Sequence, residues 1–267
     1  MRELTNKPEI EKTQFNVNIA GLEAEINTVY PSSFFFCQQY ISDGVPLFKV
    51  LVTQEDIQNE IDEGKEFFYT YTGREDDNKG YEISKKINES QLELSIVYRK
   101  FVEAALDYDI VFMHGAVIAY NNQSIMFTAP SGTGKTTHVM QWLQNLKDTY
   151  IVNGDKPLIK ITDNDVTAYG TPWCGKEKMN TNTKMPLKAI VLMERNEQNH
   201  IEEISFGQAY PFLLRQTYLP HDPEKAKKTL ILLSKLYKQV HIYRFQFNNF
   251  EENCFKVAYQ GIFGTKE

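Results

Sequence analysis

One glycine-rich stretch contains the residues that are best suited to chemistry. Positions 129–137 read Ala-Pro-Ser-Gly-Thr-Gly-Lys-Thr-Thr. Apart from Ala129, which stands where a first glycine is usual, this matches a phosphate-binding P-loop. In such a loop, backbone N–H groups cradle the phosphates, the lysine reaches the β- and γ-phosphates and the next hydroxyl binds Mg²⁺. We therefore expect a nucleotide site formed by Ser131, Gly132, Thr133, Gly134, Lys135, Thr136 and Thr137.

A carboxylate for the same site follows the loop in the sequence. Asp155 stands 20 residues after Lys135, within Asn-Gly-Asp-Lys and directly after a short apolar run. Phosphoryl transfer needs a metal ligand and a group that orients or deprotonates the acceptor, and a carboxylate at a strand end can serve either need. The structural alternative is a turn aspartate, because Asn-Gly-Asp is also good turn chemistry. Lys156 is either a phosphate contact or a solvated turn lysine.

Other candidate site residues are less specific. His114 could transfer a proton or hold a phosphate of the acceptor, since the ordinary pKa of histidine lies near neutrality; it could equally be a hydrogen-bonded histidine beneath the site. A loop that contains Trp173, Lys176 and Glu177 could close over a nucleotide or an acceptor, or it is an ordinary loop with a packed tryptophan. Arg215, in an otherwise apolar helix, could emerge into the site or form a surface ion pair.

Strands and helices must position these residues, and hydrophobic periodicity indicates where they lie. The pattern predicts a β-hairpin within 15–30 and strands at 34–37, 47–52, 67–71, 111–113, 116–120, 124–128, 150–152, 158–161, 166–169, 189–193 and 242–247. It predicts helices at 54–63, 89–107, 138–146, 207–218 and 250–263, and another that begins at Pro223. Asn88 with Gln91 resembles a capping box, and Asp222 before Pro223 is typical of a helix N-terminus.

The order of these elements predicts the fold class. A typical P-loop protein alternates strands and helices around a parallel sheet, whereas here the strands come in antiparallel-looking pairs on both sides of the loop. We therefore expect a mixed α/β (α+β) fold, with the P-loop on a mixed, hairpin-rich sheet flanked by helices. We divide the chain into an N-terminal α/β region at 1–109, which could pack into the core as one unit, and a P-loop core at 110–267.

Composition limits the classes of partner. The 267 residues carry a formal net charge of −6, and 42% of them are hydrophobic. An acidic balance argues against nucleic acid or an anionic membrane as a partner, and no apolar run approaches the roughly 18–20 residues of a membrane span. The first residues have no signal-peptide core. Three widely spaced cysteines, Cys37, Cys174 and Cys254, predict neither a disulfide framework nor a zinc site and fit a reducing cytoplasm.

Four segments together resemble a known family. His-Gly-Ala-Val-Ile-Ala at 114–119, about a dozen residues before the P-loop, is similar to the HPr kinase/phosphorylase family. The loop is also similar to that of ATP-dependent phosphoenolpyruvate carboxykinases, which share that core fold. Residues 153–157 and 169–177 look like a divergent bacterial branch of the HPr-kinase-like proteins. The resemblance is specific from about residue 110 to residue 200.

The resemblance implies an ATP- and Mg²⁺-dependent serine kinase fold. It makes Thr136 a metal ligand, Asp155 a metal ligand and general base, and His114 the active-site histidine. Two features depart from the family pattern. The family carries two adjacent acids where this chain has Gly154-Asp155-Lys156, so another acid such as Glu177 could supply the second. The segment that supports the reverse, phosphorolysis reaction is not found.

The expected function is therefore a cytoplasmic kinase that transfers the γ-phosphoryl group of ATP to a hydroxyl, most simply a serine in a protein or peptide. The expected catalytic residues are Asp155, His114 and Lys135. One alternative is a kinase for a free amino acid or other small metabolite. The other is a nucleotide-responsive binding protein without catalysis, which the missing second acid favours. A homo-oligomer is compatible with the resemblance.

Overall fold

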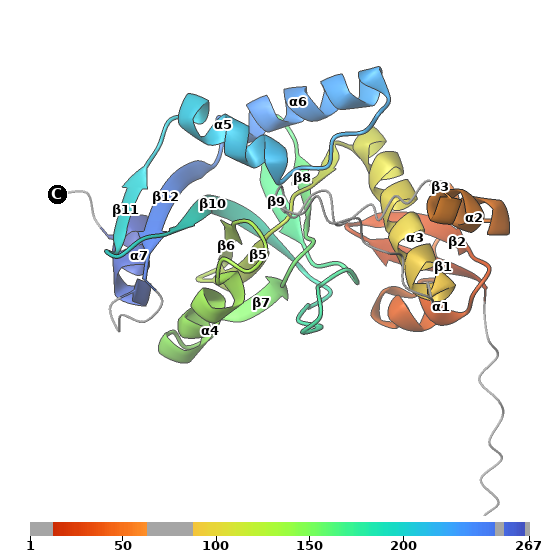
Figure 1. The fold of residues 1–267 in the computed structure, drawn as a ribbon, viewed down its shortest axis with the longest axis horizontal. Helices are drawn as coiled ribbons and strands as arrows, with labels where there is room; N and C mark the ends of the chain where they lie inside the picture. The colour runs from red at the N-terminus through yellow and green to blue at the C-terminus, as the bar shows by residue number, and fades with distance from the viewer. Residues whose placement is uncertain (1–12, 63–87, 249–253, 265–267) are drawn as a thin grey trace, which may run out of the picture.

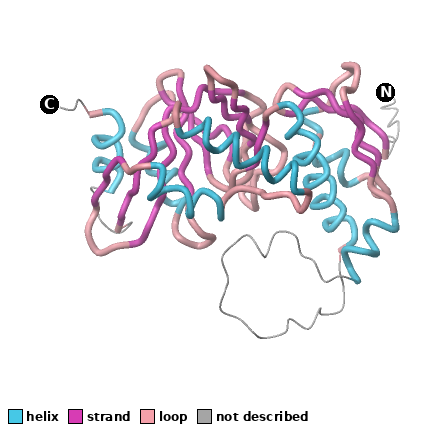
Figure 2. The backbone as a smooth tube through the Cα atoms, turned by 90° about the horizontal axis from the view of Figure 1, so that it is seen from above, coloured by secondary structure: helices cyan, strands magenta, loops and turns pink. Residues whose placement is uncertain are grey.

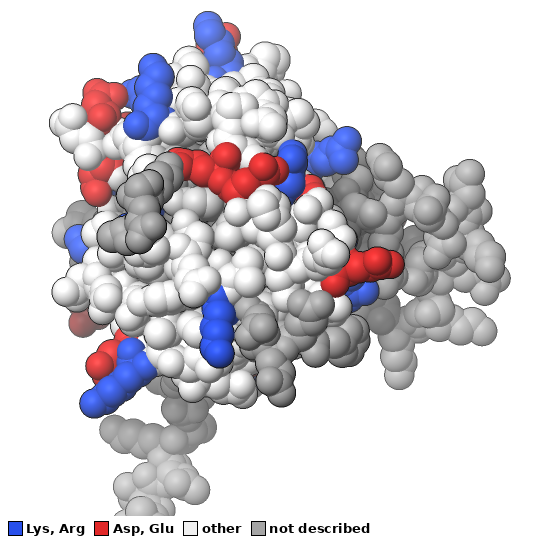
Figure 3. Space-filling model, turned by 90° about the vertical axis from the view of Figure 1, so that its left-hand side faces the viewer, with Lys and Arg blue, Asp and Glu red and all other residues white. Residues whose placement is uncertain are grey.

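The computed structural model describes residues 13–62, 88–248 and 254–264. Within them the chain is a mixed α/β structure with two β-sheets and seven α-helices (Figure 1). The strand predicted at 67–71 lies outside the described residues. Among the helices described, none is both long and apolar enough to cross a membrane. The face at the left of Figure 1 carries interspersed acidic and basic groups, with no broad basic area among the described residues drawn there (Figure 3).

A small sheet and three helices form the N-terminal part. The strands are β1 (Gln14–Ile19), β2 (Leu22–Asn27) and β3 (Phe48–Leu51), and the helices are α1 (Ser32–Phe36), α2 (Gln54–Asp62) and α3 (Glu89–Ala105), with a 3₁₀ turn at Gln38–Tyr40. The predicted hairpin is confirmed, because β1 pairs antiparallel with β2 and alternate side chains of both strands point into the core. β3 then adds in parallel beside β2. In Figure 2 this sheet lies at the end of the elongated molecule that carries the N-terminus.

Two local predictions in this part are wrong. Residues 34–37 were expected as a strand from their aromatic run, yet they belong to helix α1 and the turn after it. Phe34 packs edge-on against Phe15, so a tertiary contact overrides the β-propensity of the run. The capping box before α3 does not form: the Asn88 side chain accepts a hydrogen bond from the Ser90 hydroxyl instead of capping the helix.

The large sheet is mixed, as predicted. Its strands are β4 (Ile110–Phe112), β5 (Ala116–Tyr120), β6 (Gln123–Thr128), β7 (Tyr150–Asn153), β8 (Leu158–Ile161), β9 (Val166–Tyr169), β10 (Lys184–Arg195), β11 (His200–Glu203) and β12 (His241–Phe247), and a 3₁₀ turn at Leu106–Tyr108 precedes them. They follow the order β4-β8-β9-β10-β6-β5-β7, and β12 pairs with both β10 and β11. Strand β10 is parallel to β6 and β12 but antiparallel to β9, so one long strand joins the two halves of the sheet.

Helices cover both faces of the sheet. Helices α5 (Phe206–Arg215) and α6 (Pro223–Tyr237) lie on one face, and α4 (Lys135–Asn145) and α7 (Cys254–Phe263) lie on the other (Figure 1). Alternation along β10 shows why: Ile190 and Leu192 enter the core beneath α5 and α6, whereas Val191 and Met193 enter the core with α4 and α7. The predicted cap of α6 is confirmed, since the Asp222 carboxylate accepts the Lys225 N–H at 2.8 Å.

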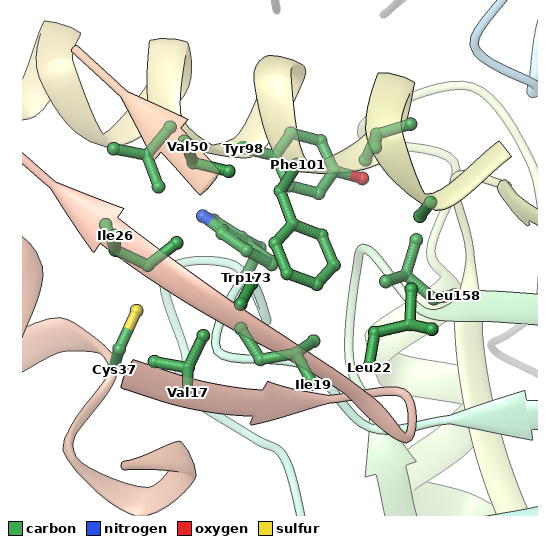
Figure 4. Close-up of a cluster of buried hydrophobic side chains, with 14 of the residues drawn as sticks. Val17, Ile19, Leu22, Ile26, Cys37, Val50, Tyr98, Phe101, Leu158 and Trp173 are labelled. Atoms are coloured by element: carbon green, nitrogen blue, oxygen red, sulfur yellow. The ribbon is translucent and has the colours of Figure 1, made fainter. Parts of the chain in front are cut away.

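The N-terminal part shares its core with the large sheet. Leu158 and Trp173 belong to the same buried cluster as Val17, Ile26 and Phe101 (Figure 4). Side chains from both sides of the predicted boundary at 109/110 thus pack together. The division into two regions remains a prediction.

A buried histidine lies near the start of α4. His138 is fully buried, and its Nε2 accepts the indole N–H of Trp142 at 3.0 Å. The rings of Phe127 and Phe245 lie 5.1 Å from its ring. Burial in this aromatic core lowers the pKa of His138 to about 3. The core therefore accepts only the neutral imidazole.

We expect this histidine to make the fold acid-sensitive. Below the unfolded-state pKa of about 6.5, the unfolded chain binds a proton that the folded chain rejects, so stability falls as pH drops toward 3. From pH 7 to pH 5 the His138 contribution to the free energy of unfolding should fall by about 2 kcal/mol. Urea denaturation of the wild type and of His138→Gln at both pH values tests this. The glutamine cannot titrate, so between pH 7 and pH 5 the variant should lose about 2 kcal/mol less unfolding free energy than the wild type. The exposed His221→Gln is the control, and equal losses in all three proteins would contradict the prediction.

Candidate active site

The glycine loop (residues 129–137) runs from the end of β6 into the first turn of α4, which is the strand–turn–helix context that the sequence predicts. Gly132 has φ +75° and Gly134, at the N-cap of α4, has φ +116°. Glycine adopts such backbone angles without the strain that a Cβ would cause. The Thr133 hydroxyl donates to the Pro130 carbonyl at 2.7 Å and closes the turn. A helix N-terminus behind a glycine turn is suited to bind an anion, and phosphate binding remains a prediction.

Lys135 lies folded over its own loop. Its Nζ donates to the carbonyl of Ala129 at 2.9 Å and, more weakly, to that of Pro130 at 3.4 Å. Burial lowers the pKa of Lys135, and the negative charge of Asp155 partly offsets that effect. The ammonium group is thus partly desolvated and electrostatically coupled to Asp155. The remaining loop hydroxyls are accessible, with Ser131 and Thr137 exposed and Thr136 half-buried in the first turn of α4.

Asp155 follows β7 on a rigid turn. The fully buried Asn153 organises this turn, because its Oδ1 accepts the backbone N–H groups of Asp155 at 2.9 Å and Lys156 at 2.7 Å. The Asn153 amide also donates to the carbonyl and the hydroxyl of Thr171. The turn chemistry of Asn-Gly-Asp is therefore present, and it serves to hold the carboxylate in one place.

His114 and Lys156 contact the two oxygens of the Asp155 carboxylate. The His114 Nε2 lies 3.1 Å from Oδ1, and the Lys156 Nζ lies 3.2 Å from Oδ2. Burial by itself would raise the pKa of Asp155, but the hydrogen bond from His114 and the charge of Lys156 lower it to about 2. Asp155 is therefore an anion at neutral pH, and His114 is part of the same cluster.

Gln216 fixes the position of His114. Its side-chain oxygen lies 2.8 Å from the His114 Nδ1, and its backbone carbonyl accepts the His114 N–H at 2.6 Å. The Thr128 hydroxyl donates to the His114 carbonyl at 2.6 Å. Gln216 was not among the predicted site residues. It comes directly after α5, 102 residues from His114 in the sequence, and no local pattern relates the two.

Topology explains why these groups meet. Strands β6 and β10 run parallel, and β5 runs antiparallel to both β6 and β7. The glycine loop after β6, His114 before β5 and Asp155 after β7 therefore lie at the same edge of the sheet. Gly115 permits the close fit, because a Cβ there would lie 2.7 Å from the Phe127 carbonyl oxygen. Its N–H also donates to the Asp155 carbonyl at 2.9 Å.

The predicted substrate loop has two different ends. Trp173 is only 5% exposed and packs on Tyr98 and Phe101, with ring centroids 4.7 and 5.7 Å away (Figure 4). The structure thus shows the packed alternative for Trp173, and its side chain is not available to a substrate in this structure.

The other end of the loop approaches Asp155. Gly175 has φ +84°, and a Cβ on it would lie 3.5 Å from the Asp155 Cγ and 3.6 Å from a Glu177 carboxylate oxygen. Both side chains therefore lie near Gly175. Lys176 and Glu177 are both exposed, and the role of Glu177 as a second acid remains a prediction.

Two arginines differ in placement. Arg215 is exposed at the end of α5 and forms no ion pair within the described residues. Arg195, at the end of β10, was not among the predicted site residues. Its guanidinium donates to the carbonyls of Gly132 at 2.7 Å and Thr133 at 2.9 Å. It therefore fixes the outer side of the glycine loop.

The residues present fit the ligand preferences of Mg²⁺. In the part of the chain that the structure describes, no three His, Cys, Asp or Glu side chains gather as a metal cluster. Mg²⁺ needs fewer protein ligands, because it keeps several waters and binds one or two carboxylates together with substrate phosphates. The Thr136 hydroxyl and the anionic Asp155 offer hard oxygen ligands of that kind.

Comparisons with known proteins identify no family for the chain. No protein-family model and no curated protein sequence matches it. Among solved structures, the HPr(Ser) kinase/phosphatase from Coxiella burnetii is similar at 8% sequence identity and a TM-score of 0.33. That match covers 57% of this chain and 93% of the other. At this TM-score the likeness supports no inference about this chain, so we base the function on the site itself.

Proposed function

We propose that the protein is an ATP- and Mg²⁺-dependent kinase that phosphorylates a hydroxyl, most simply a serine in a protein or peptide. One observation carries the proposal. An anionic carboxylate in contact with a histidine lies at the same sheet edge as the glycine loop, and its charge reaches the loop lysine. Together with the motifs at 114–119 and 153–157, this favours a divergent branch of the HPr-kinase-like proteins.

The nucleotide end of the site has a defined role in this reaction. The loop N–H groups and Lys135 hold the ATP phosphates, and binding draws the Lys135 ammonium away from the two loop carbonyls that it contacts. Thr136 and Asp155 hold Mg²⁺, which neutralises charge on the transferring group. Positioning and charge compensation of this kind account for most of the catalysis of phosphoryl transfer.

The acceptor end uses Asp155 and its neighbours. Asp155 orients the acceptor hydroxyl and takes its proton, and a weak base suffices because the loose transition state demands little early deprotonation. His114 fixes the carboxylate through Oδ1. Lys156 compensates charge from the Oδ2 side. Glu177 is our candidate for the second acid, because its carboxylate lies near Gly175, in the turn beside Asp155.

Label transfer tests the proposal and separates it from its alternatives. The purified chain is incubated with γ-labelled ATP and Mg²⁺, with either a serine-containing peptide pool or a pool of free amino acids and hydroxyl metabolites. We expect label in the peptide pool, and none after EDTA treatment or in Lys135→Ala. Label in the small-molecule pool alone would contradict a protein or peptide acceptor. Tight ATP binding without any transfer would contradict the kinase and indicate a nucleotide-responsive binding protein.

A further inference from the structure

A hollow lies on the side of the glycine loop that faces away from Asp155. It has a volume of about 400 Å³, and its walls are residues 130–133 of the loop together with Met193, Glu194, Arg195 and Phe212. Met193, Glu194 and Arg195 come from the end of β10, and Phe212 comes from α5. A volume of this size falls within the usual range for small-ligand sites.

The order of the strands shows where this hollow lies relative to the glycine loop, His114 and Asp155. Along the sheet edge the order is β10-β6-β5-β7, so the glycine loop after β6 separates the end of β10 from His114 and Asp155. The reacting phosphoryl group must face His114 and Asp155. A triphosphate laid along the loop therefore leaves its other end toward the hollow. In open α/β sheets, ligands bind in the crevice beyond the carboxyl ends of strands in this way.

The walls of the hollow combine an aromatic ring with a carboxylate, a combination that suits a nucleoside. Phe212 is a partly buried aromatic ring, and Met193 is fully buried, so Phe212 supplies the aromatic surface of the hollow. A half-buried carboxylate, Glu194, stands at the strand end, and its nearest cation is Arg244 at 3.9 Å. Arg195 is already engaged with two loop carbonyls. An aromatic face can stack on a base, and an acid at a strand end can bind ribose hydroxyls.

We infer that this hollow binds the nucleoside of the nucleotide, with Phe212 against the base and the Glu194 carboxylate on the ribose hydroxyls. The inference rests on the proposed function, because it needs the triphosphate to lie on the glycine loop. It adds the residues that distinguish a nucleotide from an inorganic polyphosphate. Phe212 and Glu194 are then specificity residues outside the catalytic cluster.

Calorimetric titration with ATP and with inorganic tripolyphosphate tests the role of Phe212. Wild type should bind ATP at least about tenfold more tightly than tripolyphosphate, and Phe212→Ala should lose about tenfold in ATP affinity with tripolyphosphate affinity unchanged. Phe206→Ala is the matched control: the same residue type on the same helix, with its ring on Tyr237, so both affinities should stay as in wild type. Equal affinity of wild type for the two anions would overturn the inference while leaving phosphate binding intact.

A second variant keeps the inference testable if Phe212→Ala does not fold. Wild type should prefer ATP to 2′-deoxyATP by about tenfold, the value of a hydrogen bond to a charged group, and Glu194→Gln should reduce that preference. An unchanged preference in Glu194→Gln would contradict the ribose contact. Binding of neither ATP nor tripolyphosphate by the wild type would overturn the proposed function itself, and the inference with it.

Discussion

Asp155→Asn should bind ATP and yet transfer its γ-phosphoryl group at least about a hundredfold more slowly, which is the lower range for loss of a general base. The amide keeps the shape of the carboxylate but can neither accept the hydroxyl proton nor carry its charge. The turn beneath it should survive, because Asn153 bonds to the backbone N–H of residue 155 and not to its side chain. The measurement is kcat for label transfer beside the Kd for ATP.

Asp163→Asn is the matched control for this variant. Asp163 also stands in a turn between strands, but its carboxylate is exposed and pairs with Lys235 at the surface. Surface pairs of this kind contribute little to stability, so the variant should keep both kcat and Kd. Retained transfer in Asp155→Asn would remove Asp155 from the chemistry. A hundredfold loss in both variants would show that the effect is not specific to the site.

The parts of the site that were predictable are those with a local signature. The type and spacing of the loop glycines predict positive φ angles. The sequence Asn-Gly-Asp after an apolar run predicts that Asp155 lies in a turn at a strand end. Both follow from the backbone chemistry of a few neighbouring residues. The prediction that the sheet is mixed also succeeded, because strand pairs separated by short turns leave little choice but antiparallel pairing.

The parts that were missed depend on contacts across the fold. Gln216 contacts His114 across a sequence separation of 102 residues, and Arg195 contacts Gly132 across 63 residues. Neither Gln216 nor Arg195 lies in a motif. Strand β11 has a mostly polar sequence, and among the described strands it pairs with β12 alone. The sequence left open whether Trp173 belongs to a loop that closes over a substrate or is simply packed, and its ring lies buried against helix α3, which precedes it by some 70 residues. The local sequence around a residue does not predict contacts with residues so distant in the chain.

The loop that contains Trp173 and Gly175 connects the N-terminal core to the surroundings of Asp155. Between Trp173 and Gly175 the chain passes from the aromatic core with Tyr98 and Phe101 to a turn beside Asp155, where a Cβ on Gly175 would lie 3.1 Å from the Asp155 Cβ. The backbone nearby is tightly fitted, since a Cβ on Gly170 would lie 1.9 Å from the Thr181 carbonyl oxygen. We therefore expect packing in the N-terminal core to position one wall of the proposed site.

Trp173→Ala should accordingly lower both stability and catalysis. Removing a buried tryptophan costs about 3–5 kcal/mol of unfolding free energy, measurable by urea denaturation. At a temperature where the variant stays folded, kcat should also fall, because the turn at Gly175 loses its anchor beside Asp155. Trp173→Phe should recover most of both losses, since the indole N–H has no hydrogen-bond partner in the described part of the chain and only ring volume is lost. A large loss of stability with unchanged kcat would mean that the turn at Gly175 holds its position without the N-terminal core.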